Sequence, residues 1–135
     1  MSLHEVEYLS PKNESDPNGR SAKEPGAKLD AGKIPIIRGA LHYFPRAILA
    51  TAEVSKFGAE KYTWNGWETV PDGFQRYTDA LGRHLLAEQI EGLYDNGPSG
   101  TGLLHAAQVA WNALARLEIL LRQVEATEVA NMVGG

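Results

Sequence analysis

The sequence predicts an all-α protein whose core is an antiparallel pair of helices. Residues 72–95 and residues 102–124 both carry side chains at helical spacing, and only a short break separates them. No stretch alternates polar and apolar residues over a length that would indicate a sheet. A chain of 135 residues is expected to form one domain that can bury a core without disulfides.

The first half of the chain is expected to contain one helix. Residues 1–25 are polar and contain several prolines, so they are predicted to form a flexible N-terminal arm. Residues 26–44 are expected to be irregular and to pack on the domain. Pro45 suits the first turn of a helix, which is predicted to end near Tyr62.

The second half is expected to form the helical hairpin. One helix is predicted to begin at 72–74 and to end near Asp95, before a stop signal at 96–101, Asn-Gly-Pro-Ser-Gly-Thr. A strongly apolar helix follows over 102–124. Residues 125–135 are predicted to be a flexible tail, which leaves residues 26–124 as the folded domain.

Four ionisable side chains are expected on one line of the first hairpin helix. His84, Glu88, Glu91 and Asp95 have spacings of 4, 3 and 4, which places them within an arc of roughly 60°. Like charges one turn apart destabilise a helix, so a bound cation is the simplest explanation. Oxygen ligands favour Mg²⁺ or Mn²⁺. The alternative is a solvated polar face.

A second polar stripe is expected on the apolar helix that follows. His105, Gln108, Asn112 and Arg116 have spacings of 3, 4 and 4. In a hairpin with a break at 96–101, Asp95 would lie near His105, and His84 near Arg116. The two facing stripes are interpreted either as a lined cleft or as a structural hydrogen-bond network.

The composition excludes several classes of protein. The chain has 17 acidic and 13 basic side chains, which argues against a protein that coats nucleic acid. It has no cysteine, so disulfides, thiolate metal sites and a cysteine nucleophile are excluded. No apolar run reaches the length of a membrane span, and no signal-peptide pattern is present, so a cytoplasmic location is expected.

Aromatic and basic residues before the hairpin have two interpretations. Trp64, Asn65 and Trp67 either anchor a packed loop or form a platform for a planar ligand, with the amide of Asn65 contacting a base edge. Lys33 and Lys61 are either ordinary surface lysines or point-charge partners for phosphate.

The order of these motifs resembles one family of enzymes. The stretches that carry the resemblance are residues 26–33, 57–62, 65–67, 83–87, 91–95 and 105–112. The chain resembles the phage dATP/dGTP diphosphohydrolases of the MazZ type, within the MazG-like all-α nucleoside triphosphate pyrophosphohydrolases. Glu88-x-x-Glu91 matches the first acidic motif of the wider group in spacing, whereas His105-x-x-Gln108 occupies the place of the second.

The resemblance implies a fold and a reaction. It implies a MazG-like helical bundle completed by oligomerisation into a homodimer or homotetramer, with Mg²⁺ or Mn²⁺ on acidic side chains. It implies hydrolysis of a purine deoxynucleoside triphosphate, dGTP or dATP, to the monophosphate and pyrophosphate. In phages of the MazZ type, the dGMP formed supplies synthesis of the 2-aminoadenine nucleotide.

Individual roles follow from this reaction. Catalysis is expected from the carboxylates of Glu88, Glu91 and Asp95. The same three residues are expected to bind the metal, together with His84 and Glu60. Substrate binding is expected from Lys33, Lys61, Trp64, Asn65, Trp67, His105 and Asn112. One free carboxylate would accept the proton of a water that attacks the α-phosphorus.

Two other functions remain open from the sequence. One is a housecleaning pyrophosphatase for non-standard or pyrimidine nucleotides, which would share the metal site and differ in the base pocket. The other is a helical module that binds a nucleotide without hydrolysing it. No nucleic-acid or membrane partner is expected for any of the three.

Overall fold

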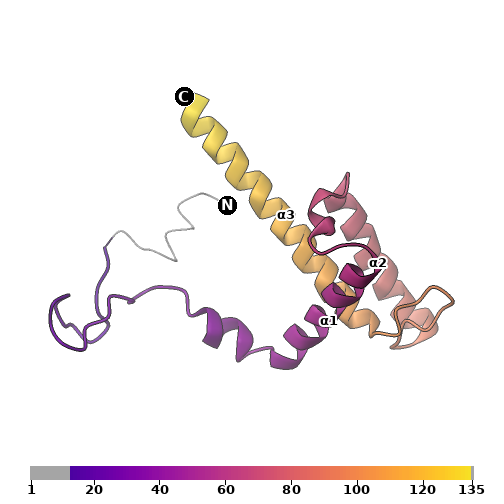
Figure 1. Ribbon diagram of the computed structural model, residues 1–135, viewed down its shortest axis with the longest axis horizontal. Helices are drawn as coiled ribbons and strands as arrows, with labels where there is room; N and C mark the ends of the chain where they lie inside the picture. Colours follow the sequence, from indigo (N-terminus) through magenta and orange to yellow (C-terminus); the bar gives the residue numbers. More distant parts are fainter. Residues whose placement is uncertain (1–12, 135) are drawn as a thin grey trace. The chain divides into compact units, whose positions relative to one another are not determined.

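The computed structural model describes residues 13–134, which are helical apart from loops and turns (Figure 1). The elements in chain order are the π-helix η2 (Ile37–Leu41), the α-helix α1 (Pro45–Lys61), the 3₁₀-helix η3 (Gly66–Thr69), and the α-helices α2 (Gly73–Glu91) and α3 (His105–Gly134). Between residues 13 and 134 the chain forms no strand, and its isolated β-bridge pairs Tyr94 with Leu104. The predicted all-α fold is confirmed.

Two compact units make up the chain. Residues 44–123 form one unit, which contains α1, η3, α2 and most of α3. The described residues on either side of it, 13–43 and 124–134, belong to the other. The predicted division into an arm, a domain over 26–124 and a tail stays a prediction.

Helix α1 begins where the sequence predicts. Pro45 is its first residue, where a missing backbone N–H costs no hydrogen bond, and the backbone N–H of Tyr62 still donates to the carbonyl of Gly58 at the other end. α1 is joined to α3 by one side-chain hydrogen bond, because Trp111 Nε1 donates to Ser55 Oγ at 2.8 Å. This bond holds α1 beside the first turns of α3.

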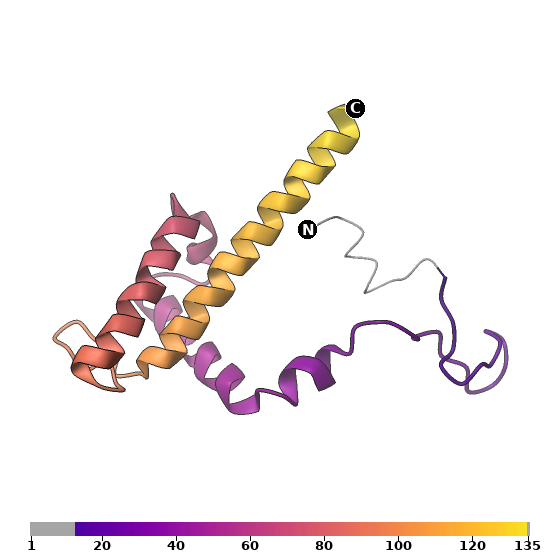
Figure 2. The ribbon, with the colours of Figure 1, turned by 180° about the vertical axis from the view of Figure 1, so that it is seen from behind.

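Helices α2 and α3 form the predicted antiparallel hairpin, with α2 alongside the first half of α3 in both views (Figures 1 and 2). Near the start of α2, a Cβ atom at Gly73 would lie 3.2 Å from Ile119, so a glycine allows the close approach. Further along, the rings of Tyr77 and Trp111 pack edge to face with centroids 5.5 Å apart.

The hairpin register differs from the prediction because α2 ends earlier. The backbone of Gly92 has φ +105°, a conformation that residues with a side chain rarely adopt. This glycine ends α2 at Glu91 rather than near Asp95. The connection therefore spans residues 92–104. The predicted pairing of His84 with Arg116 is wrong, since Arg116 Nε donates to Thr78 Oγ1 at 3.0 Å.

Helix α3 is longer than predicted. It runs to Gly134, whereas the sequence placed its end near residue 124. Residues 125–133 contain neither glycine nor proline, so no local signal stops the helix before Gly134. Among the described residues, no helix, including α3, is both long enough and apolar enough to cross a membrane.

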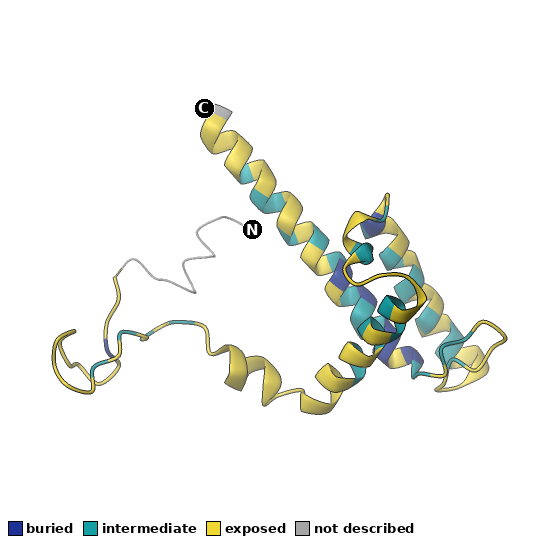
Figure 3. Cartoon of the chain, viewed as in Figure 1, coloured by how far each residue is buried: buried dark blue, intermediate teal, exposed yellow. Residues whose placement is uncertain are grey.

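The interior of the hairpin is unusually polar. Among the described residues the buried apolar side chains are Ala107 and Ala115, whereas the buried polar ones on the same helix are His105, Gln108 and Asn112 (Figure 3). Large apolar side chains remain exposed on α2 and α3, namely Leu85, Leu86, Ile90, Leu114, Leu117 and Leu120. The hairpin therefore buries a polar cluster and leaves much of its apolar surface uncovered.

Candidate active site

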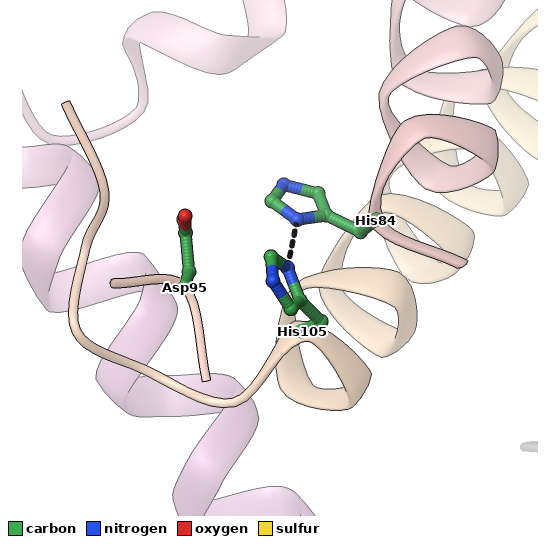
Figure 4. Close-up of side chains that lie close together, drawn as sticks. All are labelled: His84, Asp95 and His105. Atoms are coloured by element: carbon green, nitrogen blue, oxygen red, sulfur yellow. Dashed lines mark hydrogen bonds between the residues drawn. The ribbon is translucent and has the colours of Figure 1, made fainter. Parts of the chain in front are cut away.

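Three potential metal ligands meet where α2 and α3 come together at the loop. His84 comes from α2, Asp95 from the loop and His105 from the first position of α3 (Figure 4). Each offers one ligand atom, and these atoms lie within 4.8 Å of one another. The predicted proximity of Asp95 to His105 is confirmed, although Asp95 is not on the helix.

Backbone hydrogen bonds within the loop bring Asp95 to this position. The N–H of Asp95 donates to the carbonyl of Leu103 at 2.9 Å, and the N–H of Gly102 donates back to the carbonyl of Asp95 at 2.8 Å. A Cβ atom at Gly100 would collide with the carbonyl oxygen of Asp95. The loop therefore folds tightly on itself, and a glycine at position 100 permits the close approach.

The carboxylate of Asp95 is oriented through its Oδ2 atom. This atom accepts hydrogen bonds from Thr101 N at 3.2 Å, Thr101 Oγ1 at 3.3 Å and Gln108 Nε2 at 3.2 Å. Burial raises the pKa of Asp95, but the bonds from Thr101 and Gln108, with the nearby His105, outweigh it and hold the pKa below its usual value. Asp95 is therefore negatively charged at neutral pH.

His84 is held as a neutral imidazole. Burial is the largest cause of its lowered pKa, and the nearby His105 and Arg83 lower it further, whereas Asp95 and Glu91 act in the opposite direction. The neutral form of histidine is the form that binds metal ions. Its Nδ1 atom lies 3.0 Å from the Nδ1 atom of His105.

His105 is almost fully enclosed, with 1% of its surface exposed. Its Nε2 atom lies 3.5 Å from Glu91 Oε2, which is within ion-pair distance. The two atoms do not meet the geometry of a hydrogen bond, however, and no other described residue forms a hydrogen bond with Nε2. The contact between Glu91 and His105 is therefore a loose electrostatic one, and a buried ring nitrogen is left without a hydrogen bond.

The stripe on α3 forms a hydrogen-bond network. Gln108 Nε2 donates to Thr101 Oγ1 at 3.1 Å as well as to Asp95, and Asn112 Nδ2 donates to the carbonyl of Gln108 at 2.7 Å. Of the two interpretations of this stripe, the contacts match the structural network. A contact of Asn112 with substrate stays a prediction.

The remaining predicted metal ligands lie apart from the three-residue cluster. Glu91 is on the last turn of α2 with its side chain 54% exposed, and Glu88 is partly buried one turn earlier. Glu60 lies on α1, is 67% exposed and pairs with Lys56 at 3.9 Å. Only Glu91 of these three makes a contact with the cluster, through His105.

The aromatic residues before α2 divide into one packed ring and one exposed ring. Trp67 lies edge to face with Tyr77 and with Trp111, at centroid distances of 6.4 and 6.2 Å. The hydroxyl of Tyr77 donates to the carbonyl of Trp67 at 2.8 Å. Trp67 thus anchors the loop, whereas Trp64 is 69% exposed and Asn65 beside it has φ +61°. Stacking on a base stays a prediction for both tryptophans.

The two predicted phosphate contacts lie in different parts of the chain. Lys61 ends α1, with its ammonium 5.2 Å from the ring centre of Tyr62. Lys33 belongs to the other compact unit, where it pairs with Glu14 at 3.2 Å. Phosphate binding by either lysine stays a prediction.

One hollow of about 530 Å³ lies at the opposite end of the helix pair. It is lined by Glu68, Val70, Asp72, Gly73, Phe74, Gln75, Ile119 and Gln123. Eleven helical positions, or roughly 16 Å, separate Gly73 from His84 along α2. Among the described residues, the group of three possible metal ligands lies at the histidine cluster and not at this hollow, so the cluster is the better candidate for chemistry.

Sequence reasoning missed the residues that hold Asp95 in place. Thr101 was considered only as the last residue of the stop signal at 96–101, and Gln108 only as a member of a stripe. Their shared contact with Asp95 depends on how the loop folds, and no spacing in the sequence encodes that fold.

Comparison with known proteins points to one family. Residues 23–129 match the family model described as dATP/dGTP diphosphohydrolase, N-terminal. The matched range contains the whole cluster and every residue predicted to bind metal or substrate. No curated protein and no solved structure matches the chain.

Proposed function

The chain belongs to the dATP/dGTP diphosphohydrolase family, and from this membership we propose that it hydrolyses dGTP, and also dATP, to the monophosphate and pyrophosphate. The observation that carries the proposal is the cluster of His84, Asp95 and His105 inside the matched region. A carboxylate and two imidazoles are ligands for a divalent cation, on which hydrolysis of a nucleotide anhydride commonly depends.

The proposed cofactor is Mg²⁺ or Mn²⁺, for which the carboxylates in and beside the cluster offer oxygen ligands. Asp95 is ionised and fixed through Oδ2, and two further carboxylates, Glu88 and Glu91, lie on the adjacent helix. A bound ion of this kind supplies charge neutralisation at the phosphates and lowers the pKa of a water molecule. Glu60 is the least supported ligand, because it lies on α1 and pairs with Lys56.

The reaction requires one proton acceptor and no covalent intermediate. The water oxygen forms a bond to the α-phosphorus, and the bond from that phosphorus to the bridging oxygen breaks, so pyrophosphate leaves with the electron pair. A carboxylate accepts the water's proton. Glu91 suits this role, because its side chain is about half exposed at the edge of the cluster.

Substrate recognition is proposed to use exposed side chains near α1 and η3. Trp64 offers an exposed ring on which a purine can stack, and Asn65 offers a donor and an acceptor for a base edge. Lys61 would offset charge on the phosphates. In a phage of the MazZ type, the dGMP formed would supply synthesis of the 2-aminoadenine nucleotide.

A second copy of the chain is proposed to cover the apolar faces of the hairpin. Ile90 is 73% exposed and Leu86 61%, while few apolar side chains of the described residues are buried. Burying such side chains against a partner would gain roughly 1.5–3 kcal/mol for each one fully covered. A homodimer or homotetramer is therefore expected, and multi-angle light scattering measures it directly.

The test of the reaction is a product analysis with each of the four deoxynucleoside triphosphates, with Mg²⁺ or Mn²⁺ and with EDTA. The proposal expects dGMP and pyrophosphate, formed fastest from dGTP and abolished by EDTA. Faster turnover of pyrimidine or modified nucleotides would indicate housecleaning instead. Binding of nucleotides without turnover would contradict an enzyme and indicate a binding module.

A further inference from the structure

We propose that His84, Asp95 and His105 bind a single divalent first-row ion that accepts nitrogen ligands, such as Zn²⁺ or Co²⁺ and more weakly Mn²⁺, and that Glu91 orients His105 from outside the ligand set. This inference deepens the proposed function and rests on the same cluster. It changes two predicted roles, since His105 becomes a metal ligand instead of a substrate contact, and Glu91 supports a ligand instead of being one.

The distance between the two histidines fits a shared ion. Their Nδ1 atoms lie 3.0 Å apart. Two nitrogens bound about 2.1 Å from one ion lie about 3.0 Å apart at a right angle, and about 3.4 Å apart at a tetrahedral angle. The observed separation therefore matches two neighbouring ligands of an octahedral ion. Figure 4 shows the ring nitrogens of His84 and His105 facing each other.

Asp95 is prepared to be the third ligand. Its hydrogen bonds from Thr101 and Gln108 all reach Oδ2, so Oδ1 is left for an ion. The donors are a backbone N–H, a hydroxyl and an amide, so the loop orients the carboxylate without neutralising it. A negative, pre-oriented carboxylate costs little reorganisation when an ion binds.

The contact between Glu91 and His105 fits the pattern seen around metal-bound histidines. If Nδ1 of His105 binds an ion, Nε2 must carry the proton, and the nearest acceptor is Glu91 Oε2 at 3.5 Å. Metal-bound histidines usually donate this second N–H to a carboxylate, which fixes the ring. The same contact explains why Nε2, buried and without a hydrogen bond, faces an acidic residue.

The donor set also sets the class of ion. Mg²⁺ prefers oxygen ligands and keeps much of its water, whereas imidazole suits the first-row transition ions and zinc. Two nitrogens and one oxygen should therefore bind Mn²⁺, and more strongly Co²⁺ or Zn²⁺, in preference to Mg²⁺. A simple hydrogen bond between the two imidazoles would give the same nitrogen distance but no affinity for an ion.

The test measures ion binding to the full chain without nucleotide, after removal of any histidine tag. Titration calorimetry with Mn²⁺, Zn²⁺ and Mg²⁺, and the spectrum of bound Mn²⁺ in electron paramagnetic resonance, give affinity and stoichiometry. One equivalent of Mn²⁺ or Zn²⁺ per chain is expected, bound at least tenfold more tightly than Mg²⁺. Because no substrate is present, failure of the hydrolysis proposal would not affect this result.

Four variants assign the ligands. His84→Ala and His105→Ala should each abolish tight binding, and Glu91→Gln should weaken it by about 10–100-fold, as expected for a residue outside the ligand set. The control His42→Ala, at an exposed histidine in the other unit, should bind as the wild type does. Circular dichroism checks folding, and His84→Ala suffices if the buried His105 variant does not fold. Equal affinity for Mg²⁺, or unchanged affinity in His84→Ala, would overturn the proposal.

Discussion

The Nδ1 atoms of His84 and His105 lie 3.0 Å apart, although the two residues are 21 positions apart in the sequence. This contact joins α2 to the first residue of α3 beside the loop that carries Asp95. The register of the hairpin and the geometry of the candidate site are thus fixed by the same pair of side chains. Changes to this pair should affect both stability and function.

Stability should fall as the pH is lowered below about 6.5. Burial lowers the pKa of His84 in the folded state, so the unfolded chain takes up a proton at a higher pH than the folded chain does. The stabilisation is complete above the unfolded pKa and is lost as the pH falls through the folded value. Urea unfolding in EDTA between pH 8 and pH 5 measures the change in free energy of unfolding.

Two variants identify His84 as the source of this pH dependence. His84→Gln should flatten the dependence between pH 7 and pH 5, whereas His42→Gln, at an exposed position, should leave the wild-type slope in place. The range stops at pH 5 so that Asp95, whose pKa lies below its usual value, stays ionised in the folded chain. An unchanged slope in His84→Gln would contradict this account.

Adding a methyl group at two glycines should have opposite effects. In Gly100→Ala the new Cβ would collide with the backbone of Asp95, so the loop must shift, at a cost of about 1–3 kcal/mol. In Gly58→Ala the new Cβ meets nothing within 4 Å inside α1, and alanine should stabilise the helix by roughly 0.5–1 kcal/mol.

Thermal and urea unfolding measure both glycine variants against the wild type. Metal binding is a second measurement. Gly100→Ala should also lower the affinity for the ion by displacing Asp95, whereas Gly58→Ala should not change this affinity. A Gly100→Ala protein with wild-type stability and affinity would show that the tight fold of the loop is unimportant.

Removing the amide of Gln108 should weaken the site without removing a ligand. In Gln108→Ala, Asp95 Oδ2 loses one of its three hydrogen bonds, so the pKa of Asp95 should rise and its orientation should loosen. Metal affinity and turnover should both fall, by about tenfold for a residue of this kind. Gln89→Ala, at an exposed position on α2, is the matched control and should change neither.

The sequence predicts the elements well and their register less well. Pro45 marks the start of α1 correctly, and the two long helical stretches give the hairpin. The end of α2 is misplaced because the Asn-Gly-Pro-Ser-Gly stretch is a stronger stop signal than the single Gly92 before it. The helix could end at Gly92 or at the later glycine-containing stretch, and the choice depends on how the loop folds against the partner helix.

The site was predictable only in part for the same reason. Helical spacing groups His84 with Asp95 for the wrong reason, because α2 ends at Glu91 and Asp95 lies in the loop. The hairpin correctly brings His105 near Asp95. The meeting of His84 with His105 depends on the β-bridge between Tyr94 and Leu104, which folds the loop and sets the start of α3. That bridge consists of backbone contacts, so the side-chain pattern carries no signal for it.

The most direct test of the account is the rate of pyrophosphate release from dGTP by the wild type, Asp95→Asn and Asp79→Asn. Asp79 is the matched control, an exposed carboxylate on α2 that accepts a hydrogen bond from Gln75 at 3.0 Å. The account predicts that Asp95→Asn keeps its fold and loses more rate than the roughly 10–100-fold expected for a residue outside the ligand set, while Asp79→Asn matches the wild type. Wild-type turnover in Asp95→Asn would contradict the claim that this cluster carries the chemistry.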